Sequence, residues 1–219
     1  QCRLVGKQSF DLNCNWKIAM EANTEVYHVR SIHPTTVAPM LDDRRNVNSF
    51  YPNGHGRMVA PNRGASPERA SAISRTGFPV LDTVSEIGRT CTQSYGVFPN
   101  WVSPLSDQTI PPLLFWPTGI NTCRLEVWTM YHGAGQGGDP ETLKNIWTSP
   151  DDSELGQVLL EDTEFGSWIQ KSMESQGFSG VPLSYQEARI YHWNQWADRL
   201  IGINNIPEEL RVEQVISDD

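Results

Sequence analysis

Four side chains that could bind or polarise a metal ion lie close together near the start of the chain. The stretch from Asn15 to Pro34 contains Glu21, Glu25, His28 and His33 among apolar residues that predict a buried helix. On a continuous α-helix, Glu25 and His28 would share one face because they are three residues apart. His33 lies roughly 140° further round than His28, so the two imidazoles can share a metal only if the helix ends or bends between them.

The residue after His33 favours such an end. Pro34 disfavours the α conformation of the residue before it. Two neutral imidazoles and one carboxylate from elsewhere in the chain would leave half of an octahedron open, which is the facial arrangement used for Fe(II) and O2 chemistry. The histidines could instead be structural or exposed, and the HExxH signature of zinc proteases is absent. The spacing alone therefore allows a metal site without identifying the metal.

The sequence of this stretch, NWKIAMEANTEVYHVRSIHP, resembles the iron-site helix of the Rieske-type non-heme iron oxygenases. In the α subunits of that family the pattern is NWK…EN…(D/E)xYHxxxxHP. The residues that match it are Asn15, Trp16, Lys17, Glu21, Glu25, Tyr27, His28, His33 and Pro34. The family's downstream ED…Q…S segment is matched by Glu161, Asp162, Gln170 and Ser175. Between the two motifs, Phe98–Asn100 and Pro117–Gly119 match the FPN and PxG signatures of the family. The resemblance therefore runs in order through nearly the whole chain.

Two positions depart from the family pattern. Ala22 stands where the family usually has Asn, although Asn23 follows it. Glu25 replaces the commoner aspartate, but some members, including those that oxidise quaternary ammonium compounds, also carry glutamate there. The first departure weakens the expectation of an amide near the iron, whereas the second keeps an acid in place.

The resemblance implies that His28, His33 and Asp162 bind a mononuclear Fe(II). Asp162 is preferred over Glu161 because the family pattern places the ligand directly after the Glu. Glu25 is the implied catalytic residue, expected to hydrogen-bond His28 and to pass electrons from the Rieske cluster of a neighbouring subunit. Without a metal, a carboxylate at Asp162 in the first turn of a helix would be stabilised by the helix dipole alone.

The elements that must position these residues are predicted from hydrophobic periodicity and turn residues. The expected strands are Cys2–Val5, Ser9–Cys14, Asn48–Tyr51, Arg57–Ala60, Thr92–Phe98, Gln108–Trp116 and Asn121–His132. Within the last strand, Leu125, Val127, Thr129 and Tyr131 alternate with other residues, as in an antiparallel strand with one face on the core. His55 is expected in an exposed turn, and Asp42–Arg45 in a solvated loop.

Helices are expected on both sides of the strands. The predicted segments are Pro67–Arg75, Asp139–Trp147, Glu161–Ser175 and a last helix from a capping box at Ser184 to Gly202. The buried stripe expected for the last helix is Ile190, Trp193, Ala197, Leu200 and Ile201. The order of elements predicts an α+β domain, and the resemblance implies the helix-grip fold (START/Bet v 1-like), an antiparallel sheet wrapped around helices.

Composition limits the organisation and the partners. With 219 residues and 38% hydrophobic content, the chain is expected to form one domain over residues 1–219. The net charge of −9 argues against nucleic acid or an anionic membrane as a partner. No apolar run approaches about 18 residues, so no membrane span is expected. Four scattered cysteines without a CxxC motif suggest a reducing, cytoplasmic environment.

The motif of the Rieske domain is not present. Family α subunits hold a [2Fe–2S] cluster through CxH and CxxH pairs, and neither pair occurs in this chain. We therefore expect a catalytic domain from a longer polypeptide, with the N-terminal Rieske domain absent from this chain. Electrons would come from NAD(P)H through a partner reductase or ferredoxin, and the assembly would be a homotrimer or α3β3.

The expected function is that of an oxygenase domain that activates O2 to hydroxylate or dihydroxylate an organic, most simply aromatic, substrate. Oxidative demethylation and monooxygenation of a quaternary amine are alternatives within the family. A helix-grip module that binds a ligand without catalysis is an alternative from another class. A zinc hydrolase is a weaker one, because only Glu25 offers a general base.

Overall fold

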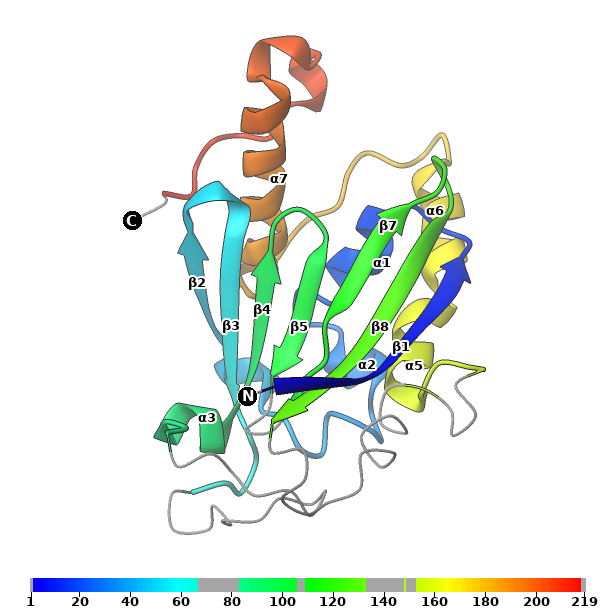
Figure 1. The fold of residues 1–219 in the computed structure, drawn as a ribbon. Helices are drawn as coiled ribbons and strands as arrows, with labels where there is room; N and C mark the ends of the chain where they lie inside the picture. Colours follow the sequence, from blue (N-terminus) through cyan, green and yellow to red (C-terminus); the bar gives the residue numbers. More distant parts are fainter. Residues whose placement is uncertain (1, 67–82, 106–108, 133–147, 149–152, 218–219) are drawn as a thin grey trace.

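The computed structural model describes residues 2–66, 83–105, 109–132, 148 and 153–217 (Figure 1). The helices predicted at Pro67–Arg75 and Asp139–Trp147 lie outside these residues. One antiparallel sheet runs through the molecule, in the order β1-β8-β7-β5-β4-β3-β2, with β6 paired to β8. Its strands are β1 Cys2–Leu12, β2 Val47–Tyr51, β3 His55–Pro61, β4 Cys91–Val97, β5 Trp101–Leu105, β6 Thr109–Ile110, β7 Leu113–Pro117 and β8 Cys123–His132.

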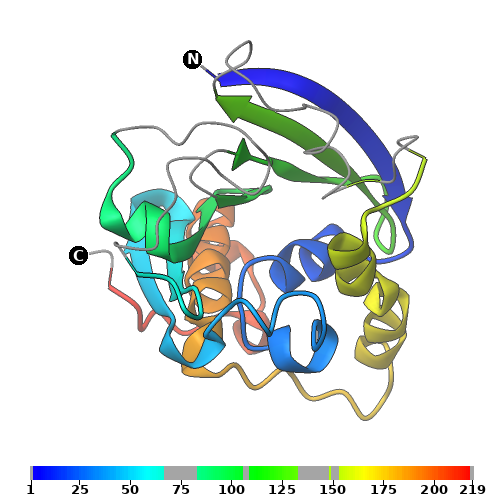
Figure 2. The same ribbon diagram turned by 90° about the horizontal axis from the view of Figure 1, so that it is seen from below.

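The helices that build the site lie on one side of this curved sheet, as Figure 2 shows for α1, α2, α5, α6 and α7. The α-helices are α1 Trp16–Ala22, α2 Val29–Ile32, α3 Glu86–Thr90, α5 Gln157–Glu164, α6 Gly166–Met173 and α7 Ala188–Ile201. Short 3-10 helices occur at Asp43–Arg45, Pro52–Gly54, Tyr185–Glu187, Ile203–Asn205 and Glu208–Leu210. Within the described residues, no helix is long and apolar enough to cross a membrane. The arrangement confirms the predicted α+β class and is consistent with a sheet wrapped around helices.

The core lies between the sheet and these helices. On β7 and β8, Leu113, Phe115, Leu125 and Val127 are fully buried. They belong to one apolar cluster with residues of α1, α5 and α7, among them Trp193. The predicted alternation on β8 is confirmed for Leu125, Val127 and Thr129, which are buried while Arg124 is exposed.

The strand predictions were right in type and less accurate in extent. The β2–β3 hairpin, β4 and β8 were predicted, but β5 was not. The predicted strand Gln108–Trp116 is two strands, because Pro111 and Pro112 between β6 and β7 lack the N–H that a ladder needs. The two strands expected in the first fourteen residues are one strand, β1, whose register shifts at a bulge between Leu4 and Gly6.

The single helix predicted from Asn15 to His33 was wrong. It is divided into α1 and α2, with a non-helical connection over residues 23–28. At the end of α1, the Asn23 amide donates to the Ala19 carbonyl (3.0 Å) and the Thr24 hydroxyl to the Met20 carbonyl (2.8 Å). Such side-chain bonds to the backbone compete with continuation of a helix.

The predicted helix Glu161–Ser175 was also wrong in its start and its continuity. The segment forms α5 and α6, which meet at Phe165, and α5 begins at Gln157. Asp162 therefore lies in the second half of α5, where the helix dipole does not favour a carboxylate. The dipole accordingly gives no reason for an acid at this position.

The last helix, α7, ends as predicted and buries Ile190 and Trp193 of the expected stripe, but it begins later and leaves the end of that stripe exposed. The capping box of Ser184 and Glu187 opens the 3-10 turn Tyr185–Glu187, from which α7 continues at Ala188, and Gly202 ends the helix with a φ of 90°. Leu200 and Ile201 were expected to be buried, yet they are 62% and 59% exposed. The buried residues are Arg189, Ile190, His192, Trp193, Gln195 and Asp198. The polar ones among them have partners, which hydrophobic periodicity does not reveal; Gln195, for example, bonds Val215 and Ile216 of the C-terminal segment.

The expectation of a solvated loop at Asp42–Arg45 was wrong for one residue. Asp43 is 3% exposed, and its carboxylate pairs with the Arg30 side chain of α2 at 2.7 Å. This pair holds the segment that follows the site histidines against α2.

Candidate metal centre

His28 and His33 mark the two ends of α2, a helix of a single turn. His28 is its N-cap and His33 its C-cap, and the Ile32 amide donates to the His28 carbonyl at 2.9 Å. The helix ends at His33, directly before Pro34, as the sequence predicted. One turn of helix therefore separates the two imidazoles, whose ring centroids are 5.1 Å apart.

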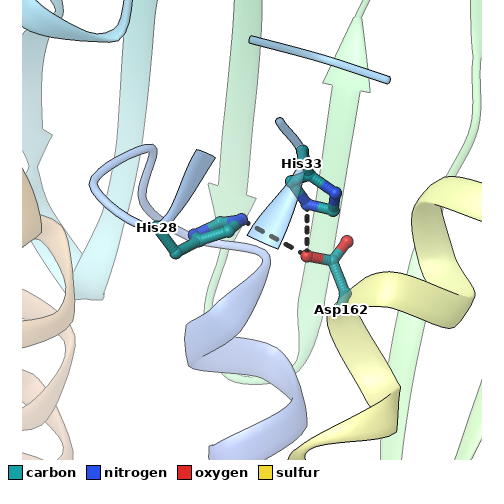
Figure 3. Close-up of side chains that lie close together, drawn as sticks. All are labelled: His28, His33 and Asp162. Carbon is teal, nitrogen blue, oxygen red and sulfur yellow. Dashed lines mark hydrogen bonds and ion pairs between the residues drawn. The ribbon is translucent and has the colours of Figure 1, made fainter. Parts of the chain in front are cut away.

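Asp162 of α5 completes a convergent group of three side chains, shown in Figure 3. Its Oδ1 atom lies 2.8 Å from His33 Nε2 and 3.3 Å from His28 Nε2. Ligand atoms about 2.1 Å from one metal ion and at right angles to each other are separated by about 3.0 Å. The two distances in this group match that separation. Among the described residues, these are the three that bring metal-binding atoms within 4.8 Å of one another.

The far side of each imidazole is held by its own glutamate. The Glu25 carboxylate contacts His28 Nδ1 and also accepts the backbone N–H of His28 (3.2 Å). The Glu161 carboxylate lies 2.7 Å from His33 Nδ1. A carboxylate at Nδ1 keeps the proton there and leaves the Nε2 lone pair for a metal, which is the usual support of metal-bound histidine. The donor set therefore fits a divalent metal ion.

Glu161 has a place in this arrangement that sequence reasoning missed, since the sequence presented it only as a rival ligand. Its carboxylate accepts the Thr36 hydroxyl (2.6 Å) and the Gln157 side-chain amide (2.9 Å). These bonds aim it at His33 Nδ1 and away from the three converging atoms. The adjacency of two acids at positions 161 and 162 was the available signal.

The electrostatics of the metal-free site favour protonated histidines. Burial alone would lower the pKa of His28, but the hydrogen bonds to Asp162 and Glu25 outweigh it and raise the pKa to about 10. Burial is likewise outweighed at His33, whose pKa is raised by Asp162 and Glu161. The hydrogen bond from His33, with those from Thr36 and Gln157, lowers the pKa of Glu161 to about 2. Metal binding would therefore displace protons from the imidazoles.

A pocket of about 250 Å³ opens beside these residues. Its apolar walls are Ile18, Ala22, Ile32, Phe165, Ile169, Met173, Val181, Leu183 and Ile190. Its polar lining consists of Glu21, Glu25, His28, Glu161, Asp162 and Glu187. Burial raises the pKa of Glu21, which accepts a hydrogen bond from Asn194. Of the described residues that line the pocket, none is Lys or Arg.

The remaining motif residues connect elements. The Gln170 side chain of α6 accepts the backbone N–H of Asn15 (2.8 Å) and so joins α6 to the start of α1. The Asn100 side chain donates to the Phe115 carbonyl (3.1 Å). His55 was expected to be exposed, but it is half-buried at the start of β3, where Nδ1 accepts the Phe98 N–H. The side chain of His132 lies outside the described residues.

Comparison with known proteins gives one family match. The family model described as "Ring hydroxylating alpha subunit (catalytic domain)" matches residues 1–203. No curated protein sequence matches the chain.

Solved structures resemble the fold over most of the chain. The quaternary ammonium Rieske monooxygenase CntA, in complex with an inhibitor, aligns with a TM-score of 0.66 and 13% identity over 90% of this chain and 49% of its own. Naphthalene 1,2-dioxygenase from Rhodococcus sp., bound to indole, aligns with a TM-score of 0.61 and 16% identity over 91% of this chain and 56% of its own. Dicamba monooxygenase bound to dicamba aligns with a TM-score of 0.57 and 13% identity over 90% of this chain and 58% of its own. The chain thus spans about half the length of these proteins, and at such identities the likeness concerns the fold.

Proposed function

The chain belongs to the family of ring-hydroxylating α-subunit catalytic domains, and on that premise we propose that it is the oxygen-activating domain of a Rieske-type non-heme iron oxygenase. The observation that carries the proposal is the convergence of His28 Nε2, His33 Nε2 and Asp162 Oδ1. Two imidazoles and a carboxylate on one face suit Fe(II) and leave its other positions open.

Each residue of the site has a defined task in this proposal. His28, His33 and Asp162 hold the iron, which when bound would supply the activation of O2. Glu25 and Glu161 keep a proton on Nδ1 of His28 and His33, which orients both rings. Both carboxylates line the pocket, and Glu161 is also held by the Thr36 and Gln157 side chains. Glu25 is the acid two residues before Tyr27-His28, which matches the family pattern, and on that resemblance we assign to it the entry of electrons.

The whole enzyme would need more than this domain. A Rieske [2Fe–2S] cluster in an N-terminal domain would deliver electrons, and NAD(P)H would supply them through a reductase or ferredoxin. Residues 1–219 would then be one catalytic domain within a homotrimer or α3β3 assembly. A cytoplasmic location stays a prediction from the cysteine pattern.

The pocket bears on the class of substrate. Its mostly apolar walls suit an aromatic ring that is hydroxylated or dihydroxylated next to the iron. A second candidate is oxidation or demethylation of an organic cation, because carboxylates such as Glu21 and Glu187 line the pocket without Lys or Arg among its described lining residues. The name of CntA, a quaternary ammonium monooxygenase, is in keeping with this candidate.

The alternatives without oxygen chemistry use the site less fully. A ligand-binding module has no need of a buried carboxylate that faces two imidazoles, each supported by a second carboxylate. A zinc hydrolase could use the same ligand atoms, and the preference for Fe(II) over zinc distinguishes the two.

The test is Fe(II) binding by anaerobically reconstituted protein. We expect about one iron per chain in the wild type, and its loss in Asp162→Ala and in His28→Ala. Glu164→Ala is the matched control, since this exposed acid lies on the same helix two residues after Asp162. Iron binding that is indifferent to Asp162, or a strong preference for zinc, would contradict the proposal. Calorimetric titration of the iron-loaded protein with an aromatic compound and with a trimethylammonium compound would then separate the two substrate classes.

A further inference from the structure

An arginine is buried in the middle of the molecule without a carboxylate partner. Arg189, in the first turn of α7, is 3% exposed. Its Nη1 donates to the Thr24 carbonyl at 2.9 Å and to Ser94 Oγ at 3.3 Å, while Nη2 has no hydrogen-bond partner. Among the described residues, no carboxylate forms an ion pair with it. Burial lowers its pKa to about 10, so the guanidinium is still charged at neutral pH.

The sheet is shaped to admit this side chain. Gly56 of β3 and Gly96 of β4 are paired across the ladder directly beside the guanidinium. A Cβ atom at Gly96 would lie 3.0 Å from Arg189 Nη2, and one at Gly56 would lie 3.4 Å from Nε. A buried charge without a counter-ion is destabilising. A fold that nevertheless leaves room for one points to a task that an apolar side chain cannot perform.

The contact with Thr24 identifies that task. Thr24 lies in the connection between α1 and α2, directly before Glu25 and four residues before His28. The hydrogen bonds that this connection makes itself are local: the Asn23 and Thr24 N–H groups bond back to α1, and the His28 N–H bonds the Glu25 side chain. The bond from Arg189 to the Thr24 carbonyl ties the connection to a distant element. Arg189 joins the connection to β4 through one guanidinium nitrogen, which bonds the Thr24 carbonyl and the Ser94 hydroxyl together. A charged donor to a buried carbonyl is stronger than a neutral one.

Two further contacts from the same part of the chain fix the regions on either side of the connection. The Asn194 side chain of α7 donates to Glu21 Oε1 of α1 at 3.2 Å. The Gln186 side chain, just before α7, donates to the Asp43 carbonyl and to Asn46 Oδ1. Asp43 in turn pairs with Arg30 of α2. These contacts hold α1 and α2, and Arg189 holds the residues between them.

We propose that Arg189 is a positioning residue for the metal centre, which fixes the backbone at Thr24 and thereby places Glu25 against His28. The role of Arg189 at the metal centre rests on the proposed function. The anchoring of residues 23–28 by Arg189 does not depend on it. Neither role requires a contact between Arg189 and the metal or the substrate.

The experiment compares Arg189→Met, Arg189→Lys and Gln195→Ala. Gln195 is the matched control because it is a fully buried polar residue on the same helix, and its bonds go to the C-terminal segment instead of the connection. We expect Arg189→Met to lower Fe(II) affinity about tenfold, as substitutions behind metal ligands do. Arg189→Lys, which keeps a charged donor, should recover part of this loss, and Gln195→Ala should bind iron as the wild type does.

Hydrogen–deuterium exchange of the metal-free proteins supplies the readout that does not depend on iron. Peptides that cover residues 23–28 should exchange faster in Arg189→Met than in Gln195→Ala, at conditions where both variants are equally folded by circular dichroism. Equal exchange in this segment would overturn the inference whatever the Fe(II) affinity, and faster exchange with unchanged affinity would overturn the role at the metal centre. A wild type without iron would overturn the proposed function, and the exchange comparison would still decide whether Arg189 holds the connection. If Arg189→Met does not fold, the same comparison is made with Arg189→Lys.

Discussion

The inner face of β7 and β8 and the metal centre are both buried, but opposite physical principles hold them together. The strands place Phe115, Leu125 and other apolar side chains out of water, so burial itself stabilises them. The metal centre buries His33 and Asp162, which are 3% and 6% exposed at the side chain and whose burial is unfavourable unless each finds a partner. Burial on the sheet therefore stabilises the fold, and the folded chain in turn keeps the polar residues of the metal centre in place.

The difference also appears in how each region is assembled. The apolar face comes from adjacent strands whose residues alternate along the chain. The centre draws on α2, on the connection before it and on α5, which is more than 120 residues away in sequence. A substitution in the first region should change stability, and one in the second should change metal binding.

The largest effect is expected from Phe115→Ala. Phe115 is fully buried in the apolar cluster, and removal of its ring should lower the free energy of unfolding by about 3–5 kcal/mol. Urea denaturation measures this change. Iron bound per folded chain should stay at the wild-type value, and a loss of iron in folded Phe115→Ala would show that the two regions are not separate.

For Glu25→Gln and Glu161→Gln, the main expected change is in metal binding instead of in stability. Each removes the charge behind one imidazole, so we expect Fe(II) affinity to fall about 10- to 100-fold in either variant. Competition with a chelator under anaerobic conditions measures the affinity. Glu126→Gln on β8 is the control, because this acid pairs with Lys7 outside the site. Affinity unchanged in both site variants would contradict the support assigned to these glutamates.

The charged character of the centre predicts a pH dependence in the metal-free protein. The pKa of His28 is about 10 in the folded state and about 6.5 in the unfolded state, so the folded state binds the proton more tightly. This stabilisation is fully present below pH 6.5 and is lost as the pH rises towards 10. The free energy of unfolding should fall by at most about 1.4 kcal/mol per pH unit in this window. Urea denaturation with a chelator at pH 6.5, 7.5 and 8.5 measures it, and His28→Gln should flatten the curve.

The smallest effect is expected on the outer face of α7. Leu200 was predicted to be buried but is 62% exposed, so Leu200→Ser should change the free energy of unfolding by no more than about 0.5 kcal/mol. Thermal or urea denaturation beside the wild type is sufficient to test this. A loss of several kcal/mol would mean that this face of α7 is covered in solution and belongs with the apolar region after all.

The sequence carried more information about the site than about the elements that build it. The spacing of His28 and His33, and the acids at positions 161 and 162, pointed to side chains that the structure does bring together. These candidate ligands could be identified without knowledge of helix boundaries, because residue types and a family pattern are read directly from the sequence. The two helices around these side chains were predicted as continuous, and both predictions were wrong. The first helix ends where the Asn23 and Thr24 side chains bond its backbone, and the second begins earlier, at Gln157.

The physical reason for the remaining errors is the range over which each interaction acts. Turn residues, the capping box at Ser184 and the alternation on β8 act locally, so they could be read from the sequence and predicted the hairpin, the turn that leads into α7 and the buried side of a central strand. Burial of a charged group depends on a partner that is distant in sequence. Asp43 beside Arg30, Glu161 behind His33 and Arg189 against Thr24 are such cases, and each pairing became visible in the folded chain.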